Sequence, residues 1–526
     1  MTDLLIANGR VVDGSGAPAF PASLVVEGDR IAHVLRIGEP EPVAKRRIDA
    51  AGSVVAPGFV DAHNHSDVSP FVEPWMDSML RQGVTSLVVG NCGASAAPPA
   101  GAVEVAELTG AAPEHLDLSW RDFAGYLDRV QTAEPALNVA SLVGHGALRL
   151  EVMGEDRRAP TGDEMDEMRR LLAGAMDAGA VGLSTGLIYA PGIHATTDEI
   201  VRLASVLSRT GGVYASHVRG EGEQVFGAVA ECIEIGRRAG VPSHISHLKV
   251  ETSFAWGRAG ELLALIDAAS ADGADVTADQ YPYTAWEGTL SSCLPPWASP
   301  AELATLRAEP ASRDRLVRSV EEGEPGWQSG VRGLGWDRLV VAAHSPTPEH
   351  TGKSLARIAA EAGGSPVDVM FDLLVADPFT SVIGHGMLEE DVRTILARED
   401  VMVASDGLAL SPGGPLGAFN VHPRYYGTFP RVLGHYVREE RLLPLEAAVR
   451  KMTSLPAERF GLVDRGRIAK GAFADLVVFD ADRVSDRATF ETPHAFAEGI
   501  DAVVVNGRVA WDGRPGVRAG RVLRRT

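Results

Sequence analysis

The sequence predicts an α/β protein in which a barrel of alternating strands and helices is joined to a smaller β domain. Three observations lead to this prediction. The chain has 526 residues, which is too long for a single small core. Its middle alternates short apolar runs with helical patterns, as the βα units of a parallel sheet do. Both ends consist of short strands separated by turns, which favours one β domain built from the two termini.

The strand-rich ends define the predicted small domain. Turns at Asn8-Gly9, Asp13-Gly14 and Glu27-Gly28-Asp29 separate the N-terminal strand candidates. The strands expected at the two ends cover residues 4–6, 10–12, 23–26, 31–34, 474–479 and 503–509. We therefore assign residues 1–55 and 462–526 to the small β domain and residues 56–461 to the barrel.

The middle of the chain supplies the predicted barrel. Strands are expected at residues 54–62, 85–89, 138–143, 182–184, 212–215, 243–245, 275–278 and 401–404. Helical patterns cover residues 161–178, 199–209, 221–239 and 259–271. These repeated units fit an eight-stranded (β/α)8 barrel. The alternation weakens from about residue 286 to about 345, which predicts an insertion at the barrel rim, either a lid over the site or a surface insertion without function.

Side chains able to bind a metal follow five of the predicted strands. In barrels of this kind the catalytic groups stand at the C-terminal ends of the strands. His63 and His65 end the first strand, and residues i and i+2 of a strand point to the same side. The other four candidates are Cys92, His217, His247 and Asp406. Because thiolate and imidazole together favour zinc over magnesium or calcium, we expect a zinc site.

Composition narrows the partners and the compartment. A formal net charge of -21 argues against nucleic acid or an anionic membrane as the main partner, and leaves a small-molecule substrate. The N-terminus lacks the pattern of a signal peptide, and no apolar run approaches the ~20 residues of a membrane span. Three cysteines cannot form a disulfide framework, and packing explains Cys232 and Cys293. We expect a cytoplasmic protein, and the oligomeric state stays open.

Several motifs resemble one enzyme family. PGFVDAHNHSD at residues 57–67 is similar to the first-strand motif of the amidohydrolase superfamily. Further motifs resemble those of the D-aminoacylase branch of this superfamily, the N-acyl-D-amino-acid deacylases. They are GNCG (90–93), GHGALR (144–149), GLSTGLIYAPG (182–192), YASHVRGEG (214–222), SHLKV (246–250), DQYPYTA (279–285) and ASDG (404–407). HPRYYGTFPRVLGHYVRE, MTSLPAERFGL and KGAFADLVVFD agree, so the resemblance extends from about residue 3 to about residue 515.

The resemblance implies a fold and a metal centre. The fold would be a distorted, TIM-like (β/α)8 barrel with a small β-sandwich domain formed by both termini and an inserted segment near the site. A tightly held zinc is implied at Cys92, His217 and His247. A second, weaker metal site is implied at His63, His65 and Asp406, with Cys92 in a bridging role.

The residues also predict a mechanism for amide hydrolysis, and the resemblance makes N-acyl-D-amino acids the substrates. Bound zinc lowers the pKa of its water to about 7 and polarises a carbonyl. Asp406 is the candidate general base and acid, while His63 and His65 polarise the carbonyl or hold the second metal. Lys249 lies two residues after His247 and is expected to clamp the substrate carboxylate. The resemblance makes Tyr281 and Arg424 further candidates for binding the substrate, and Tyr189 is expected to line the pocket.

Other functions stay open at this stage. Related sequences usually carry small residues where this chain has Trp286 and Glu287, which could repel a carboxylate, so an amide without a free α-carboxylate is one alternative. A cyclic-amide hydrolase of the dihydropyrimidinase or hydantoinase type is another, but it requires a bridging strand-end lysine, and Cys92 takes that place. A catalytically silent scaffold would have lost metal ligands, whereas all six candidate positions are present.

Overall fold

The computed structural model describes residues 1–36, 38–111, 116–418 and 420–525. Within these residues, eight parallel strands form the central barrel. They are β6 (Phe59–Asp61), β7 (Val84–Val89), β8 (Asn138–Ser141) with its continuation β9 (Val143–Gly144), β10 (Gly182–Gly186), β11 (Val213–His217), β12 (Ser243–Ile245), β13 (Val276–Gln280) and β17 (Val401–Val403). The barrel closes just beyond β17 and β6, where the backbone N–H of Asp406 donates to His63 O (2.9 Å) and that of His65 to Gly407 O (2.8 Å). The predicted barrel is confirmed.

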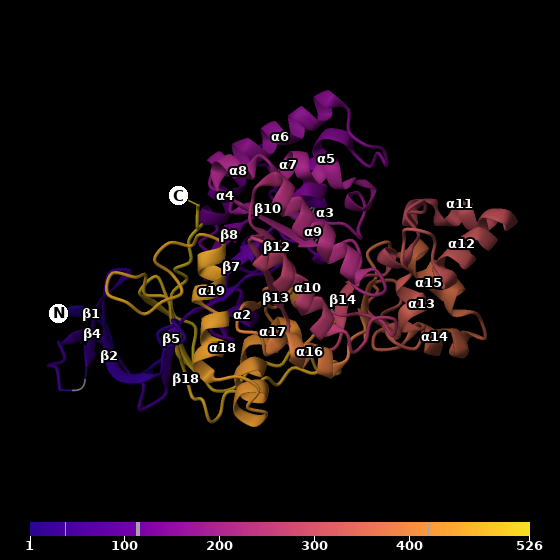
Figure 1. Cartoon of the computed structure of the whole chain (residues 1–526). Coiled ribbons are helices and arrows are strands. Elements are labelled where there is room, and N and C mark those ends of the chain that lie inside the picture. Colours follow the sequence, from indigo (N-terminus) through magenta and orange to yellow (C-terminus); the bar gives the residue numbers. More distant parts are fainter. Residues whose placement is uncertain (37, 112–115, 419, 526) are drawn as a thin grey trace.

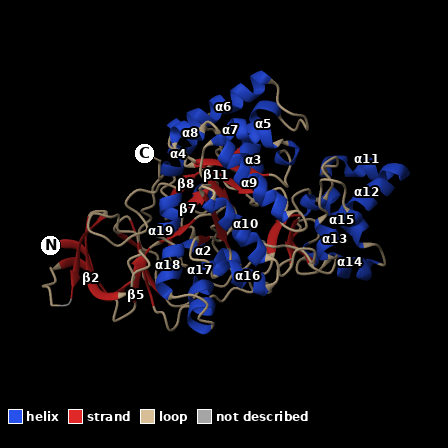
Figure 2. Cartoon of the chain, viewed as in Figure 1, coloured by secondary structure: helices blue, strands red, loops and turns tan. Residues whose placement is uncertain are grey.

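Helices follow the barrel strands and surround them (Figure 2). They are α1 (Ser69–Val72), α2 (Asp77–Leu80), α3 (Ala100–Leu108), α4 (Phe123–Thr132), α5 (His145–Met153), α6 (Gly162–Asp177), α7 (Thr197–Ala204), α8 (Leu207–Thr210), α9 (Val225–Ala239), α10 (Ala259–Ala271), α16 (Glu389–Leu396), α17 (Arg424–Arg431) with a π-helical continuation (Val432–Glu439), α18 (Leu445–Lys451) and α19 (Ser454–Arg459). The predicted helix at 161–178 begins at its N-cap Thr161, which forms a capping box with Glu164. No helix in the described ranges combines the length and apolar character that a membrane span requires.

Strands from both ends of the chain form one sheet beside the barrel, in indigo and yellow in Figure 1. Its order is β20-β19-β18-β5-β1-β2-β3, with β4 also paired to β1. The strands are β1 (Thr2–Val11), β2 (Phe20–Glu27), β3 (Arg30–Arg36), β4 (Ala44–Asp49), β5 (Val54–Pro57), β18 (Leu476–Phe479), β19 (Ile500–Val505) and β20 (Arg508–Trp511). The expected β domain from both termini is therefore present. The predicted turn at Asn8-Gly9 is a bulge inside β1 instead, and β4 was not expected.

The predicted single strand at 54–62 is wrong. The chain divides there into β5, which pairs with β18 and β1 in the terminal sheet, and β6, which pairs with β7 in the barrel. Gly58 lies at the division, and a Cβ at this position would collide with the side chain of Thr85 in β7. The absence of a side chain thus lets the chain pass from one sheet to the other directly before the first barrel strand.

The insertion is larger than the sequence predicts. Its antiparallel sheet has the order β14-β16-β15, with β14 (Trp286–Thr289), β15 (Leu339–Ala343) and β16 (Ser381–Gly384). Its helices are α11 (Leu303–Ala308), α12 (Pro310–Glu322), α13 (Gly330–Leu334), α14 (Leu355–Ala362) and α15 (Pro366–Ala376), which project from the barrel in Figure 1. The predicted end near residue 345 is too early, because β16 completes this sheet and α14 and α15 share its apolar core.

Candidate metal centre and active site

Cys92 lies at the centre of a cluster of histidines at the C-terminal ends of the barrel strands. Its Sγ is 3.3 Å from His63 Nε2, 3.4 Å from His247 Nε2 and 3.7 Å from His217 Nδ1. Two ligand atoms on a tetrahedral zinc with bonds of ~2.0–2.3 Å are separated by about 3.3–3.8 Å. The donor types and their separations therefore fit a zinc ion.

Asp406 joins this cluster from the end of β17. Its Oδ1 is 3.2 Å from His65 Nε2 and 3.4 Å from His63 Nε2. All six ligand candidates chosen from the sequence thus lie together. Within the described residues, two overlapping groups have ligand atoms close enough for one ion: His63, Cys92, His247 and Asp406, and His217, Glu221 and His247.

Glu221 is a site residue that sequence reasoning missed. Its carboxylate oxygens are 3.5 Å from His217 Nε2 and 3.1 Å from His247 Nδ1, so it faces the ring nitrogens on the far side from Cys92. A carboxylate in this position fixes the tautomer and orientation of a ligating histidine. The available signal was its position four residues after His217.

Three of the clustered residues have a left-handed backbone. The φ angles are 53° at Cys92, 37° at His247 and 49° at Asp406. Non-glycine residues adopt such angles rarely, at a cost of about 1–3 kcal/mol each, and they gather at functional sites. Gly186 lies against the carbonyl of Cys92, where a Cβ would collide. The fold therefore holds three site residues in a sparsely populated backbone conformation.

Asp279 supports the cluster from the end of β13. Its carboxylate accepts the backbone N–H of His247 (2.8 Å), lies 2.7 Å from His244 Nε2 and is 3.6 Å from His63 Nδ1. Burial opposes ionisation of this carboxyl, but His63 and His244 lower its pKa below the usual range. The barrel rule would have identified Asp279, because it follows the strand predicted at 275–278.

The electrostatics favour a thiolate at Cys92. Burial opposes its ionisation, but the facing His63 and His247 hold the pKa of the thiol well below its usual range. The deprotonated thiol is the form that binds metals. Burial likewise raises the pKa of Cys232 and Cys293, which lie away from the cluster, so they stay protonated.

The four substrate-binding candidates surround the cluster. Lys249 Nζ is 2.7 Å from Glu221 Oε1 and 2.9 Å from His247 Nδ1, while Arg424 Nη1 is 3.0 Å from Asp406 Oδ2. Both cations lie near the ring of Tyr281, at 5.5 Å and 4.9 Å from its centroid. The buried hydroxyl of Tyr281 has no hydrogen-bond partner in the described part of the chain. Tyr189 packs edge-on against the ring of His217, with centroids 4.8 Å apart.

The carboxylate of Glu287 is anchored within the protein. It accepts hydrogen bonds from the backbone N–H of His422 (3.1 Å) and from Ser381 Oγ (3.0 Å). These two hydrogen bonds fix the position of the Glu287 carboxylate.

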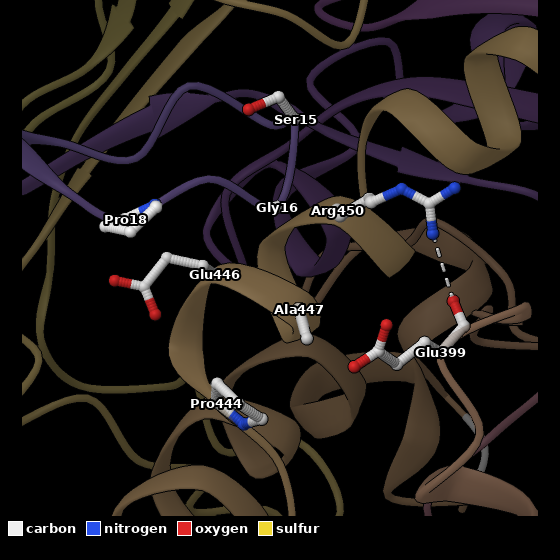
Figure 3. Close-up of a pocket in the computed structure, with 8 residues that line it drawn as sticks. All are labelled: Ser15, Gly16, Pro18, Glu399, Pro444, Glu446, Ala447 and Arg450. Carbon is white, nitrogen blue, oxygen red and sulfur yellow. Dashed lines mark hydrogen bonds between the residues drawn. The ribbon is translucent and has the colours of Figure 1, made fainter.

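A cavity of about 570 Å³ lies away from the cluster, between the loop that follows β1 and helix α18 (Figure 3). Its lining includes Ser15, Arg450 and Glu399. Glu399 precedes β17 and Asp406 follows it, so this cavity and the cluster lie at opposite ends of that strand. We assign the active site to the cluster, where the reactive side chains converge.

Known proteins resemble the chain over its whole length. Residues 46–510 match the family described as "Amidohydrolase family". A D-aminoacylase of Alcaligenes xylosoxydans xylosoxydans is 42% identical over 526 residues, which cover 100% of this chain and 98% of that one. A structure of D-aminoacylase with a binuclear metal centre matches with a TM-score of 0.84, 40% identity and full coverage of both chains. A zinc and phosphonate-inhibitor complex of N-acyl-D-glutamate deacylase from Bordetella bronchiseptica matches with a TM-score of 0.82, 36% identity and 99% coverage of each chain. The chain therefore belongs to the amidohydrolase family, in the branch that contains D-aminoacylase and the related N-acyl-D-amino-acid deacylases.

Proposed function

We propose that this chain is a zinc-dependent deacylase that hydrolyses the amide bond of N-acyl-D-amino acids, releasing a D-amino acid and a carboxylate. The observation that carries the proposal is the convergence of Cys92 with three histidines beside Asp406, in a chain that resembles a D-aminoacylase from end to end. The choice of D over L configuration rests on the relatives. The substrate is a small molecule, and the expected compartment is the cytoplasm.

The donor set divides into two metal positions. Cys92, His217 and His247 would hold one zinc tightly, because a thiolate and two imidazoles suit this ion. His63, His65 and Asp406 would hold a second metal more weakly, with Cys92 shared between the positions. When bound, zinc supplies a Lewis acid for the substrate carbonyl and lowers the pKa of a water molecule.

Asp406 is suited to move the proton. Burial opposes its ionisation, but Arg424, His247 and His63 keep its pKa well below the usual range, so the free site carries a carboxylate there. Oδ1, which faces His63 and His65, takes a proton from the attacking water and then gives it to the leaving nitrogen. This transfer is needed because an amine anion is a very poor leaving group.

Lys249, Arg424 and Tyr281 supply the contacts for a substrate carboxylate. Burial opposes the charge of Lys249, but Glu221 raises its pKa, so the ammonium stays protonated. Arg424 is buried and, beside Asp406, also charged. The hydroxyl of Tyr281, which has no hydrogen-bond partner among the described residues, is a further donor. Two buried cations beside a reacting centre favour an anionic substrate over an amide without a carboxylate.

Hydrolysis of paired enantiomers tests the proposal. The zinc-loaded protein should release acetate from N-acetyl-D-methionine and not from N-acetyl-L-methionine. An Asp406→Asn variant should lose about 10²–10⁴-fold in kcat, because it cannot accept the proton. Hydrolysis of a carboxylate-free amide without turnover of any N-acyl amino acid would contradict the substrate class.

A further inference from the structure

In the part of the chain that the structure describes, no continuous ladder of backbone hydrogen bonds joins the first and last strands of the barrel. Strand β6 pairs with β7, and strand β17 pairs with β13. Between β6 and β17 there is one isolated bridge, which joins Asn64 to Gly407 just beyond the ends of both strands. We call the contact of residues 61–65 with residues 405–407 the seam. His65 and Asp406 face each other across it, so side-chain contacts contribute to the distance between them.

The buried carboxylate of Asp61 crosses the seam from the end of β6. Its Oδ1 accepts the backbone N–H of Ser405 at 2.8 Å, and its Oδ2 accepts the hydroxyl of the same residue. Two hydrogen bonds to one residue fix the position of Ser405 relative to β6. Because Ser405 directly precedes Asp406, Asp61 helps to set the point from which the candidate proton carrier extends.

Asp406 needs such support because its backbone is left-handed, with a φ of 49°. A strained conformation of this kind persists only where the surrounding contacts hold it. The Ser405 hydroxyl, which donates to Asp61, also accepts the backbone N–H of Gly407 at 3.0 Å. Asp406 is thus held on both sides by a network that begins at Asp61.

The same carboxylate holds the segment that carries the two histidines of the second metal position. Its Oδ2 accepts Asn64 Nδ2 at 2.9 Å, and its Oδ1 accepts the backbone N–H of His63 at 3.4 Å. Asn64 lies between His63 and His65, and its Nδ2 is also 3.3 Å from Ser405 Oγ. Asp61 is therefore bonded to the segments on both sides of the seam.

The donors that satisfy Asp61 are gathered at the metal ligands. A buried carboxylate is costly unless hydrogen-bond donors satisfy it. These donors belong to His63, Asn64 and Ser405, and each is either a ligand candidate or the direct neighbour of one. A carboxylate that only joined the two strands could take its donors anywhere along them.

We propose that Asp61 is a positioning residue for the second metal position and for the proton carrier Asp406, acting through Ser405 and Asn64. It sets the distance between Asp406 and the histidines of that position. The first metal position does not depend on it, because its ligands follow strands other than β6 and β17. This inference rests on the proposed deacylase function and adds a residue to its machinery.

Zinc binding to an Asp61→Asn variant tests this role. The amide keeps the size of the carboxylate and one oxygen for the N–H of Ser405, but its nitrogen then faces the amide nitrogen of Asn64, donor against donor. Equilibrium dialysis of the one-zinc protein against rising Zn²⁺ should show an affinity for the second zinc about 10–100-fold lower than in the wild type. The first zinc should stay bound.

Kinetics provide a second measure of the same variant. The kcat for N-acetyl-D-methionine should fall by about 10–100-fold, because a displaced Asp406 transfers the proton less well. The KM should change by less than about 3-fold, because Lys249 and Tyr281 follow other strands of the barrel.

The double variant Asp61→Asn/Asn64→Asp exchanges donor and acceptor across one hydrogen bond. The amide at position 61 can donate to the carboxylate at position 64, and the Ser405 hydroxyl, which lies 3.3 Å from Asn64 Nδ2, can donate to it as well. This variant should recover about 10-fold in kcat and in second-zinc affinity relative to Asp61→Asn. Recovery of neither would overturn the hydrogen-bond network as the cause of the loss.

Asp475→Asn is the matched control. Asp475 is also buried, and it accepts the backbone N–H of Asn506 at 2.7 Å and Asn138 Nδ2 at 3.3 Å. Asn138 begins β8, so this carboxylate lies at the opposite end of the barrel from the metal cluster. The melting temperature of the control should fall as that of Asp61→Asn does, whereas its kcat and second-zinc affinity should match the wild type.

The outcomes distinguish the positioning role from the function beneath it. Wild-type kcat and second-zinc affinity in folded Asp61→Asn, or equal losses in Asp475→Asn, overturn the positioning role and leave the deacylase function standing. No turnover of any N-acetyl-D-amino acid by the wild type overturns the function, and the second-zinc affinities of the variants then still decide the role of Asp61.

Discussion

Arg424 and Asp406 form a buried ion pair, with Nη1 3.0 Å from Oδ2, at the edge of the Cys92 cluster. The pair joins the candidate carboxylate clamp to the candidate proton carrier. A substrate carboxylate that binds Arg424 competes with Asp406 for the same guanidinium. Substrate binding would then raise the pKa of Asp406 and make it a better proton acceptor at the moment when one is needed.

Replacing Arg424 by methionine should weaken substrate binding and change the pH profile. Loss of a charge-assisted hydrogen bond of about 1.5–3 kcal/mol should raise KM for N-acetyl-D-methionine by about 10–100-fold. Arg424 is the largest favourable influence that lowers the pKa of Asp406 against burial, so its removal should raise that pKa and move the acid limb of kcat to higher pH. Initial rates across pH 5–9 measure both effects.

The exposed Arg258, which lies over the ring of Phe226 and pairs with Glu261, provides the matched control. Arg258→Met should leave KM and the acid limb where they are in the wild type. An unchanged KM in Arg424→Met would remove Arg424 from the substrate site.

Asp279→Asn should weaken metal binding without removing a direct ligand. The carboxylate holds the backbone of His247 and faces His63 and His244, and loss of such an outer partner costs about 10–100-fold in metal affinity. Competition with a chelator of known zinc affinity measures the change. Asp275→Asn, at an exposed position just before the same strand, is the control, and equal affinities in the two variants would show that Asp279 does not support the site.

Lys451 should make stability depend on pH. Burial lowers its pKa to about 7, and its Nζ donates to the carbonyls of Leu396 and Arg398. In an unfolded chain the pKa of a lysine is ~10.4. At pH values between the two pKa values, Lys451 carries a proton in the unfolded state that it lacks in the folded state, so the free energy of unfolding rises with pH. The advantage of the wild type over Lys451→Met should therefore grow from pH 7 to pH 9, by up to about 1.4 kcal/mol per pH unit.

The difference in melting temperature between wild type and Lys451→Met, measured at the two pH values, checks this prediction. The exposed Lys470→Met should show a difference that does not vary with pH. A Lys451→Met difference that is equally constant would mean that Lys451 keeps its proton in the folded state.

The barrel and the cluster were predictable because both follow from simple periodicities. Short β-branched runs separated by helical patterns identify parallel strands, and a parallel barrel brings all the strand ends to one face. His217 and His247 lie where that rule requires, at the end of β11 and just beyond β12. Sequence periodicity therefore predicts both the fold class and the convergence of these side chains.

What the sequence did not reveal depends on tertiary contacts. Glu221 lies in a loop rich in glycine and charge, and apart from its position four residues after His217 nothing in the sequence predicts that it is buried beside two histidines. The predicted helix at 221–239 begins only at Val225, and Glu221 lies before it beside the two histidines. The end of the insertion was misplaced because a helix followed by the strand at 381–384 has the same pattern as a barrel unit. Only the antiparallel pairing of β16 distinguishes them.

Zinc content tests the central claim most directly, namely that Cys92 and the facing histidines form a metal site. After exhaustive dialysis, elemental analysis of the wild type should find about one zinc per chain. Cys92→Ala should lose most of it, whereas Cys293→Ala, whose thiol is buried in the insertion core, should keep it. Retention of zinc by Cys92→Ala would contradict the account.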